Sequence, residues 1–155
     1  MATYRKATLD DVLEIVRFQI AMAKETEEIE LDSATCTAGV RAVLGHPDTG
    51  NYYVSEVDGI VAAALLITYE WSDWRNGVVW WIQSVYVLPQ FRRKGIYRGL
   101  YLHIRGLAES QHEVKGIRLY VDRKNIPAQQ VYTALGMTGN HYQVFEWMKN
   151  LSGTK

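Results

Sequence analysis

The 155-residue sequence contains a single cysteine, Cys36. One cysteine excludes an internal disulfide framework, and Cys36 has no neighbouring Cys or His at the spacing of metal ligands, so we predict no metal site. No apolar run reaches the ~18 to 20 residues that a transmembrane helix needs, and residues 1–11 lack the apolar core of a signal peptide. These absences indicate a cytoplasmic protein without a membrane partner.

The sequence also lacks an excess of charge of either sign, because 17 basic residues balance 17 acidic ones. A protein that coats nucleic acid carries more positive charge than this, so nucleic acid is not an expected partner. No internal repeat, long linker or low-complexity segment divides the chain. We therefore predict a single domain over residues 1–150, followed by a short tail at 151–155.

Hydrophobic periodicity predicts a mixed α/β (α+β) protein in which helices flank a mostly antiparallel sheet. The turn residues Asp58 and Gly59 join two of the strands in a hairpin. Thr8 and Asn125 stand where N-caps are expected, and Gly136 stands just past a helix end. The predicted strands are 2–7, 51–57, 60–71, 78–88, 116–121 and 141–148, and the predicted helices are 9–24, 33–45, 94–111 and 126–135.

One short segment, QFRRKGIYRGLY at residues 90–101, has the composition of an anion site. It follows a strand that stops at Pro89, and it passes through three cationic residues and Gly95 into an amphipathic helix. The first turn of a helix offers unpaired backbone N–H groups and the positive end of the helix dipole. A pyrophosphate would fit there, although a solvated basic helix start is an equally simple interpretation.

Three segments together resemble the GNAT superfamily of acetyl-CoA-dependent N-acetyltransferases: IQSVYVLPQF, RRKGIYRGL and DRKNIPAQQVYTALGM. The family signature of Arg or Gln, two residues, Gly, one residue, then Gly or Ala maps onto Arg92, Gly95 and Tyr97. Tyr97 departs from the pattern because it replaces a small residue. Asn125 and Tyr132 have the spacing of the Asn and Tyr that family members often carry.

The resemblance implies a GNAT-like sheet of about six or seven strands with four helices, acetyl-CoA as cosubstrate, and roles for particular residues. Tyr132 would donate a proton to the departing thiolate as general acid. Backbone N–H groups near Val87, at the splayed end of its strand, could bind the thioester carbonyl and the oxyanion that develops from it. The residues expected to bind the cofactor are Val85, Tyr86, Val87, Arg92, Arg93, Lys94, Gly95, Ile96, Tyr97, Arg98, Asn125 and Tyr132.

The acceptor amine must lose a proton before it attacks, because a primary amine with a pKa near ~10.4 is almost entirely protonated at neutral pH. No histidine stands at an obvious place to accept this proton. We predict Glu28 and Glu70 as the catalytic carboxylates, and we predict that Glu25, Glu27, Glu28 and Trp71 bind the substrate. The alternative for the acidic stretch at 24–32 is a solvated connection with no role in catalysis or binding.

Residues 68–87 also look like the corresponding part of the diamine acetyltransferases, although Gln83 and Ser84 replace residues that are acidic in those enzymes. The leading hypothesis is an N-acetyltransferase that acts on a primary amine of a small cationic molecule by direct attack in a ternary complex. The alternatives are a protein or peptide N-acetyltransferase and a non-catalytic CoA-binding module. The large residues of segment 141–148 suggest a homodimer.

Overall fold

The computed structural model describes residues 1–149, and it divides the chain into two compact units. The first unit comprises residues 1–119, and the second begins at Tyr120. The expected tail at 151–155 lies outside the described residues. Each unit is described by itself below.

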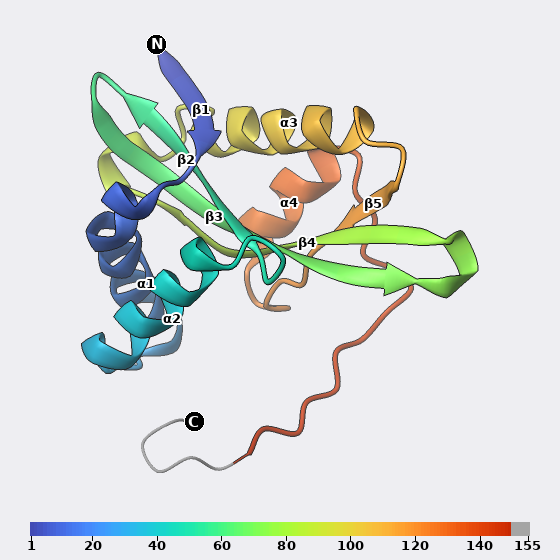
Figure 1. The fold of residues 1–155 in the computed structure, drawn as a ribbon, viewed down its shortest axis with the longest axis horizontal. Helices are drawn as coiled ribbons and strands as arrows, with labels where there is room; N and C mark the ends of the chain where they lie inside the picture. Colours follow the sequence, from blue (N-terminus) through green and yellow to red (C-terminus); the bar gives the residue numbers. More distant parts are fainter. Residues whose placement is uncertain (150–155) are drawn as a thin grey trace. The chain divides into compact units, whose positions relative to one another are not determined.

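The first unit is built on a curled sheet (Figure 1) whose strands lie in the order β1-β2-β3-β4-β5. Neighbouring strands pair antiparallel from β1 to β4, whereas β4 and β5 pair parallel. This arrangement confirms the predicted mixed, mostly antiparallel sheet. The strands are β1 (Ala2–Lys6), β2 (Asn51–Val57), β3 (Ile60–Ser72), β4 (Gly77–Val87) and β5 (Val114–Arg118).

The hairpin between β2 and β3 forms at the predicted turn. Asp58 has a φ of 51° and Gly59 a φ of 77°, so both central residues adopt the left-handed conformation of a type I′ turn. The twist of this turn matches the right-handed twist of the strands that it joins. The register Val57↔Ile60 therefore follows directly from the local sequence.

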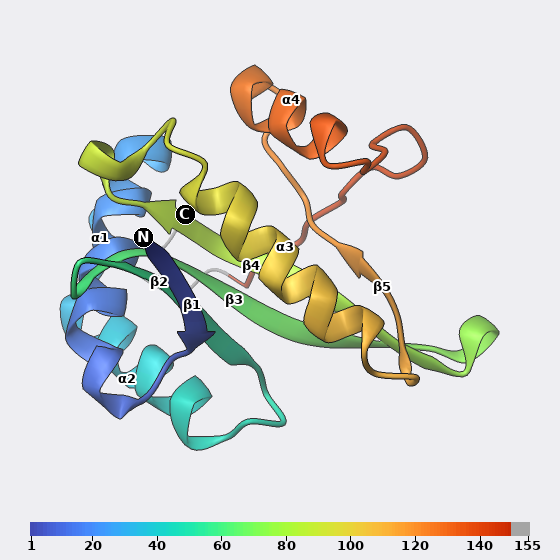
Figure 2. The ribbon, with the colours of Figure 1, turned by 90° about the horizontal axis from the view of Figure 1, so that it is seen from above.

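Three helices cover the sheet of the first unit: α1 (Val12–Glu27), α2 (Ser33–Gly45) and α3 (Ile96–Glu109). Helices α1 and α2 pack on one face, and α3 crosses the opposite face (Figure 2). Helix α1 extends three residues past the predicted end at residue 24, because Glu25 and Glu27 favour helix and Glu28 supplies the left-handed residue that ends it. None of the helices formed by residues 1–149 is long and apolar enough to cross a membrane.

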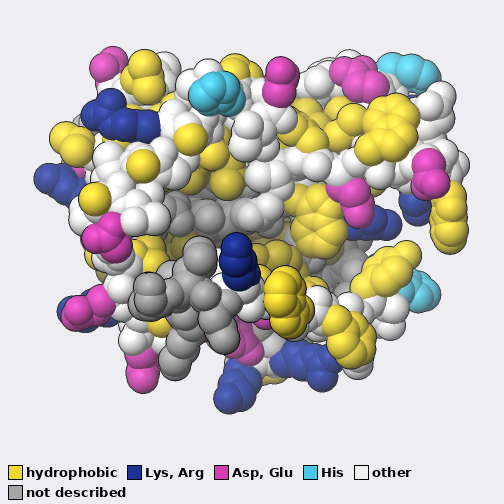
Figure 3. Space-filling view, turned by 60° about the horizontal axis from the view of Figure 1, so that its bottom comes forward, with side chains coloured by type: hydrophobic (Ala, Val, Ile, Leu, Met, Phe, Trp, Pro, Cys, Tyr) yellow, Lys and Arg dark blue, Asp and Glu magenta, His cyan; other side chains and the backbone are white. Residues whose placement is uncertain are grey.

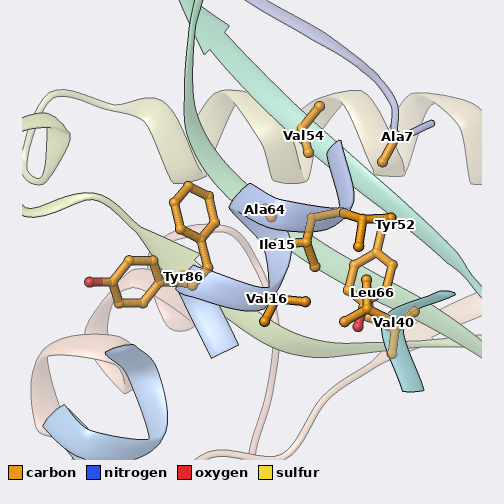
Figure 4. Close-up of a cluster of buried hydrophobic side chains, with 11 residues drawn as sticks. Ala7, Ile15, Val16, Val40, Tyr52, Val54, Ala64, Leu66 and Tyr86 are labelled. Carbon is orange, nitrogen blue, oxygen red and sulfur yellow. The ribbon is translucent and has the colours of Figure 1, made fainter. Parts of the chain in front are cut away.

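The core beneath α1 and α2 is made of alternate residues of the sheet, as Figure 4 shows. Tyr52, Leu66 and Tyr86 contribute to this cluster, and Ile15 and Val16 of α1 pack against them. The residues between them point to the other face, where Leu65 and Ile67 are fully buried beneath α3. Strand β3 is buried on both faces at residues 62–67, which explains the continuous apolar run there.

An ion pair between the half-buried Arg5 and the buried Asp11 fixes the entry into α1. The Asp11 carboxylate accepts hydrogen bonds from Arg5 Nη1 at 2.8 Å, from Arg5 Nη2 at 2.9 Å and from the Thr8 backbone N–H at 2.8 Å. Asp11 is only 5% exposed. These bonds tie β1 to the start of the helical region, where the sequence predicted a Thr8 cap.

The second unit contains the helix α4 (Ile126–Ala134). Asn125 is its N-cap, and Gly136 follows its end with a φ of 85°, so both predicted boundaries are confirmed. The predicted strand at 141–148 is wrong, because residues 142–149 form neither helix nor strand. The sheet of the described part of the chain thus has five strands and not six or seven. Alternating large residues favour an extended backbone, but a strand forms only where a neighbouring strand can hydrogen-bond to it.

Candidate active site

Strand β4 carries a bulge that redirects its last residues. Tyr86 pairs with Ala64 and Gln83 pairs with Leu66, so Ser84 and Val85 together stand opposite the single residue Leu65. Ser84 has a φ of 53°, a left-handed conformation that is uncommon for serine. An extra residue in one strand bends that strand and interrupts its ladder. The sequence analysis did not anticipate this bulge, and a serine within an apolar strand was the only local signal of it.

Beyond the bulge, one edge of β4 has no neighbouring strand in the described part of the first unit. The pairing of β4 with β5 ends at Trp81↔Arg118, while β4 continues to Val87. The Leu88 N–H donates to Ala62 O at 2.9 Å, so alternation turns the Val87 N–H toward the edge that faces away from β3. The Val87 N–H, which we predicted to bind the thioester carbonyl, thus points toward the edge of β4 that lies opposite β3.

The loop from Arg92 to Gly95 leads from this strand end into α3. Arg93 has a φ of 62° and Gly95 a φ of 77°, so two left-handed residues stand just before the first helical residue, Ile96. Successive N–H groups in such a turn converge to form a concave anion site, and the helix start adds its own N–H groups. Arg93, Lys94 and Arg98 are exposed around the loop. The residues present therefore fit a pyrophosphate.

Replacing Gly95 by alanine is expected to weaken acetyl-CoA binding about tenfold or more. Space is available for the new Cβ, since no atom lies within 4 Å of it, but the left-handed φ costs a non-glycine residue about 1–2 kcal/mol. Calorimetric titration with acetyl-CoA measures the change. Gly106→Ala is the matched control, because Gly106 lies within α3 with nothing within 4 Å of its Cβ position and no positive φ. Equal affinities for Gly95→Ala and wild type would contradict the loop's role.

Tyr97, which occupies the position of the small residue in the family signature, lies in the first turn of α3 and is half-buried. It directly follows the buried Ile96, which is 8% exposed and packs inward. Two residues expected to bind the cofactor thus have side chains directed at least partly into the protein. Their backbone N–H groups belong to the helix start, so they can contribute through the backbone.

Arg92 forms an ion pair with Glu25, which lies in the last turn of α1. Arg92 Nη2 donates to Glu25 Oε2 at 2.8 Å, and the Tyr86 hydroxyl donates to Glu25 Oε1 at 2.8 Å. The hydrogen bond from Arg92 holds the pKa of the Glu25 carboxyl below its usual value. Burial, with the Glu25 carboxylate beside it, raises the pKa of Tyr86. The structure therefore joins a predicted cofactor residue to a predicted substrate residue.

The other acidic residues at the end of α1 are solvent-exposed. Glu27 is the last residue of the helix, and Glu28 caps it with a φ of 56°. Acidic and basic side chains are interspersed on the face shown in Figure 3, so charge is not grouped by sign there. The carboxylates of Glu27 and Glu28 therefore lie in solvent.

Glu70 lies on β3 far from the residue that pairs with Tyr86 of β4. It is six residues from Ala64, the partner of Tyr86, which corresponds to about 20 Å of extended strand. Its Oε2 accepts a hydrogen bond from Arg118 Nη1 at 2.7 Å. Trp71 is 63% exposed and, as the next residue of the strand, points to the opposite face of the sheet. The structure therefore does not bring Glu70 and Trp71 together with Glu25.

Asn125 and Tyr132 belong to the second unit. The Asn125 side chain accepts a hydrogen bond from the Ala128 N–H at 3.1 Å, so it caps α4 and shapes the turn before that helix. Tyr132 lies within α4 and is half-buried. The first unit by itself thus brings together Glu25, Tyr86, Val87 and Arg92 from the predicted set.

The part of the chain that holds the bulged β4 and the basic loop before α3 matches a known family. Residues 12–137 match the acetyltransferase (GNAT) family. The chain belongs to this family. GNAT acetyltransferases take the acetyl group from acetyl-CoA, so the fold and cosubstrate implied by the sequence motifs are confirmed at the level of the family.

Solved structures of other GNAT-like proteins resemble this acetyltransferase over almost its whole length. A possible acetyltransferase from Clostridium difficile 630 is 41% identical, with a TM-score of 0.90 over 97% of this chain and 99% of that chain. A predicted acetyltransferase from Clostridium acetobutylicum, solved with acetyl-CoA, is 21% identical, with a TM-score of 0.71 over 97% and 96%. Glucosamine-6-phosphate N-acetyltransferase from Arabidopsis thaliana is 17% identical, with a TM-score of 0.73 over 96% and 99%. A search of curated proteins gave no significant match.

Proposed function

We propose that this GNAT protein transfers the acetyl group of acetyl-CoA to a primary amine of a small cationic molecule, by direct attack in a ternary complex. The observation that carries the proposal is the left-handed loop at Arg93 and Gly95, which joins the open edge of β4 to the start of α3. This arrangement offers N–H groups to a thioester at one end and to a pyrophosphate at the other.

Bound acetyl-CoA supplies a thioester carbonyl, and the chain's own residues then act on the groups around it. The Val87 N–H stabilises the negative charge that develops on the carbonyl oxygen when the amine nitrogen attacks the carbonyl carbon. As the carbon–sulfur bond breaks, Tyr132 donates its phenolic proton to the thiolate. The protonated amine loses two protons. One passes to a carboxylate, directly or through water, before the attack, and the other leaves the nitrogen as the amide forms and restores the Tyr132 phenol, so the proton count balances.

Of the two predicted carboxylates, we assign that proton to Glu28 and not to Glu70. Glu28 follows Glu25 by three residues, or about 5 Å along a helix axis, and Glu25 contacts Tyr86 of β4. Glu70 lies about 20 Å along β3 and is already paired with Arg118. The exposed carboxylates of Glu27 and Glu28 would also attract a cationic substrate.

Two measurements on the purified protein test the proposal. Acetyl-CoA at about a hundred times its dissociation constant stabilises a protein by ~2.7 kcal/mol, which corresponds to about 5 to 11 °C in melting temperature for a chain of this size. Release of free thiol from acetyl-CoA is then measured with a panel of polyamines, amino sugars and lysine peptides. We expect a saturable shift and fastest thiol release with a small cationic amine.

The possible results separate the proposal from its alternatives. Fastest turnover with lysine peptides would favour a protein or peptide acetyltransferase. A melting shift without thiol release from any amine would favour a CoA-binding module.

The similarity to diamine acetyltransferases and the homodimer remain predictions. The exposed apolar side chains of Tyr142, Phe145 and Trp147 support a contact between copies.

A further inference from the structure

The Arg92 side chain connects the end of β4 to the end of α1. Its Nε donates to the Val87 carbonyl oxygen at 2.9 Å, and its Nη2 donates to Glu25 Oε2 at 2.8 Å. The guanidinium carbon also lies 5.3 Å from the centroid of the Tyr86 ring. The guanidinium thus contacts two consecutive residues of β4 and one residue of α1.

Glu25 completes the same connection through its second oxygen, Oε1, which accepts a hydrogen bond from the Tyr86 hydroxyl at an O–O distance of 2.8 Å. The Tyr86 ring packs against Phe18 of α1, with centroids 5.2 Å apart. Tyr86 is therefore held by its side chain and Val87 by its carbonyl group, both through the Glu25–Arg92 pair. The Val87 N–H belongs to the peptide group between these two residues.

We propose that Arg92 is a positioning residue for acetyl transfer: with Glu25 it fixes the backbone around the Val87 N–H. The pyrophosphate is then held by Arg93, Lys94, Gly95 and the start of α3. A planar guanidinium presents its donors in a fixed fork, and the two donors described here point to a carbonyl and a carboxylate. This inference rests on the proposed function, because it assigns the Val87 N–H to the thioester carbonyl.

The pair adds little to the stability of the fold, which favours a positioning role. The side chains of Arg92 and Glu25 are 43% and 42% exposed, and ion pairs exposed to this degree contribute little to folding. Variants that break the pair are therefore expected to fold. An N–H donor displaced by about 1 Å, in contrast, reduces the rate of a positioned reaction by as much as ~100-fold.

The kinetic test uses Arg92→Met, Glu25→Ala and the double variant. We expect kcat to fall ~10- to 100-fold in each, the KM for acetyl-CoA to change less than twofold, and the double variant to be no slower than Arg92→Met. Arg93→Met, in the same loop, is the matched comparison and is expected to raise the KM for acetyl-CoA instead. The proposal is overturned if Arg92→Met raises this KM as Arg93→Met does, or if the losses in the two single variants multiply.

A spectroscopic readout separates this proposal from the acetyltransferase assignment. The backbone amide resonances of Val87 and Gly95 are followed by NMR as acetyl-CoA is added. In wild type we expect acetyl-CoA to change the chemical shifts of both resonances. In Arg92→Met we expect the Gly95 resonance to respond to acetyl-CoA as it does in wild type, and the Val87 resonance to respond differently. An unchanged Val87 response in Arg92→Met would exclude positioning by Arg92. Wild type that shows the expected response but releases no thiol would exclude the proposed transfer and leave the positioning intact.

Discussion

Replacing Tyr132 by phenylalanine is expected to slow turnover by ~10- to 1000-fold while leaving the affinity for acetyl-CoA nearly unchanged. The reason is that the phenolic proton is needed only when the thiolate leaves. A thiol with a pKa near ~8.5 is a moderately good leaving group without help, so the reaction slows and does not stop. Thiol release measures the rate, and calorimetric titration measures the affinity.

Tyr142→Phe is the matched control for this variant, since it removes the same hydroxyl group from a residue of the second unit that is 79% exposed. It is expected to keep wild-type turnover. Unchanged turnover in Tyr132→Phe would remove Tyr132 from the general-acid role. A weaker affinity at unchanged kcat would assign its hydroxyl to cofactor binding instead.

Replacing Asp11 by asparagine is expected to destabilise the protein by about 3 kcal/mol. The buried carboxylate accepts two hydrogen bonds from Arg5, and a hydrogen bond to a charged group contributes ~1.5–3 kcal/mol, although Arg5 keeps its ion pair with Glu56. For a chain of this size the loss corresponds to about 6 to 12 °C in melting temperature, measured by calorimetry or circular dichroism. Asp10→Asn is the control, because Asp10 is exposed and is expected to change stability by less than about 0.5 kcal/mol.

The contribution of Asp11 also depends on pH in a defined direction. The hydrogen bond from Arg5 holds the pKa of the Asp11 carboxyl below its usual value of 3.8. A carboxyl whose pKa is lower in the folded state stabilises the protein above its unfolded-state pKa, and this stabilisation disappears as the pH falls through the folded-state pKa. The stability difference between wild type and Asp11→Asn should thus be constant above about pH 5 and shrink below about pH 4. A difference that grows toward acid would contradict this origin.

Local sequence signals predicted the turns and caps of the fold. Asp58-Gly59, Asn125 and Gly136 adopt the conformations that their residue types favour, because the preference resides in the backbone and in one nearby hydrogen bond. Gly95 is another residue whose conformation follows from its residue type. Its left-handed φ and its position before α3 make the loop that the basic segment predicted.

Contacts between distant segments escaped the sequence analysis. Arg92 and Glu25 are 67 residues apart, so nothing local indicates that a predicted phosphate ligand would pair with a predicted substrate residue. The bulge at Ser84 depends on the register between β3 and β4, which single-strand patterns do not contain. The predicted strand at 141–148 failed for a related reason, since extended propensity does not supply a hydrogen-bonded partner.

The sequence alone determined the family, the mixed sheet with its helices, and the basic loop that leads into a helix. These features could be predicted because periodicity, caps and motif spacing depend only on residues that are close in sequence. Only the tertiary structure decided which groups meet. Within the first unit it left β4 beyond Trp81 without a strand opposite β3, joined Arg92 to Glu25 and Val87, and separated Glu70 from them along β3. Strand register and helix packing decide which residues distant in sequence lie close in space. Both depend on the packing of the whole core, which no single segment contains.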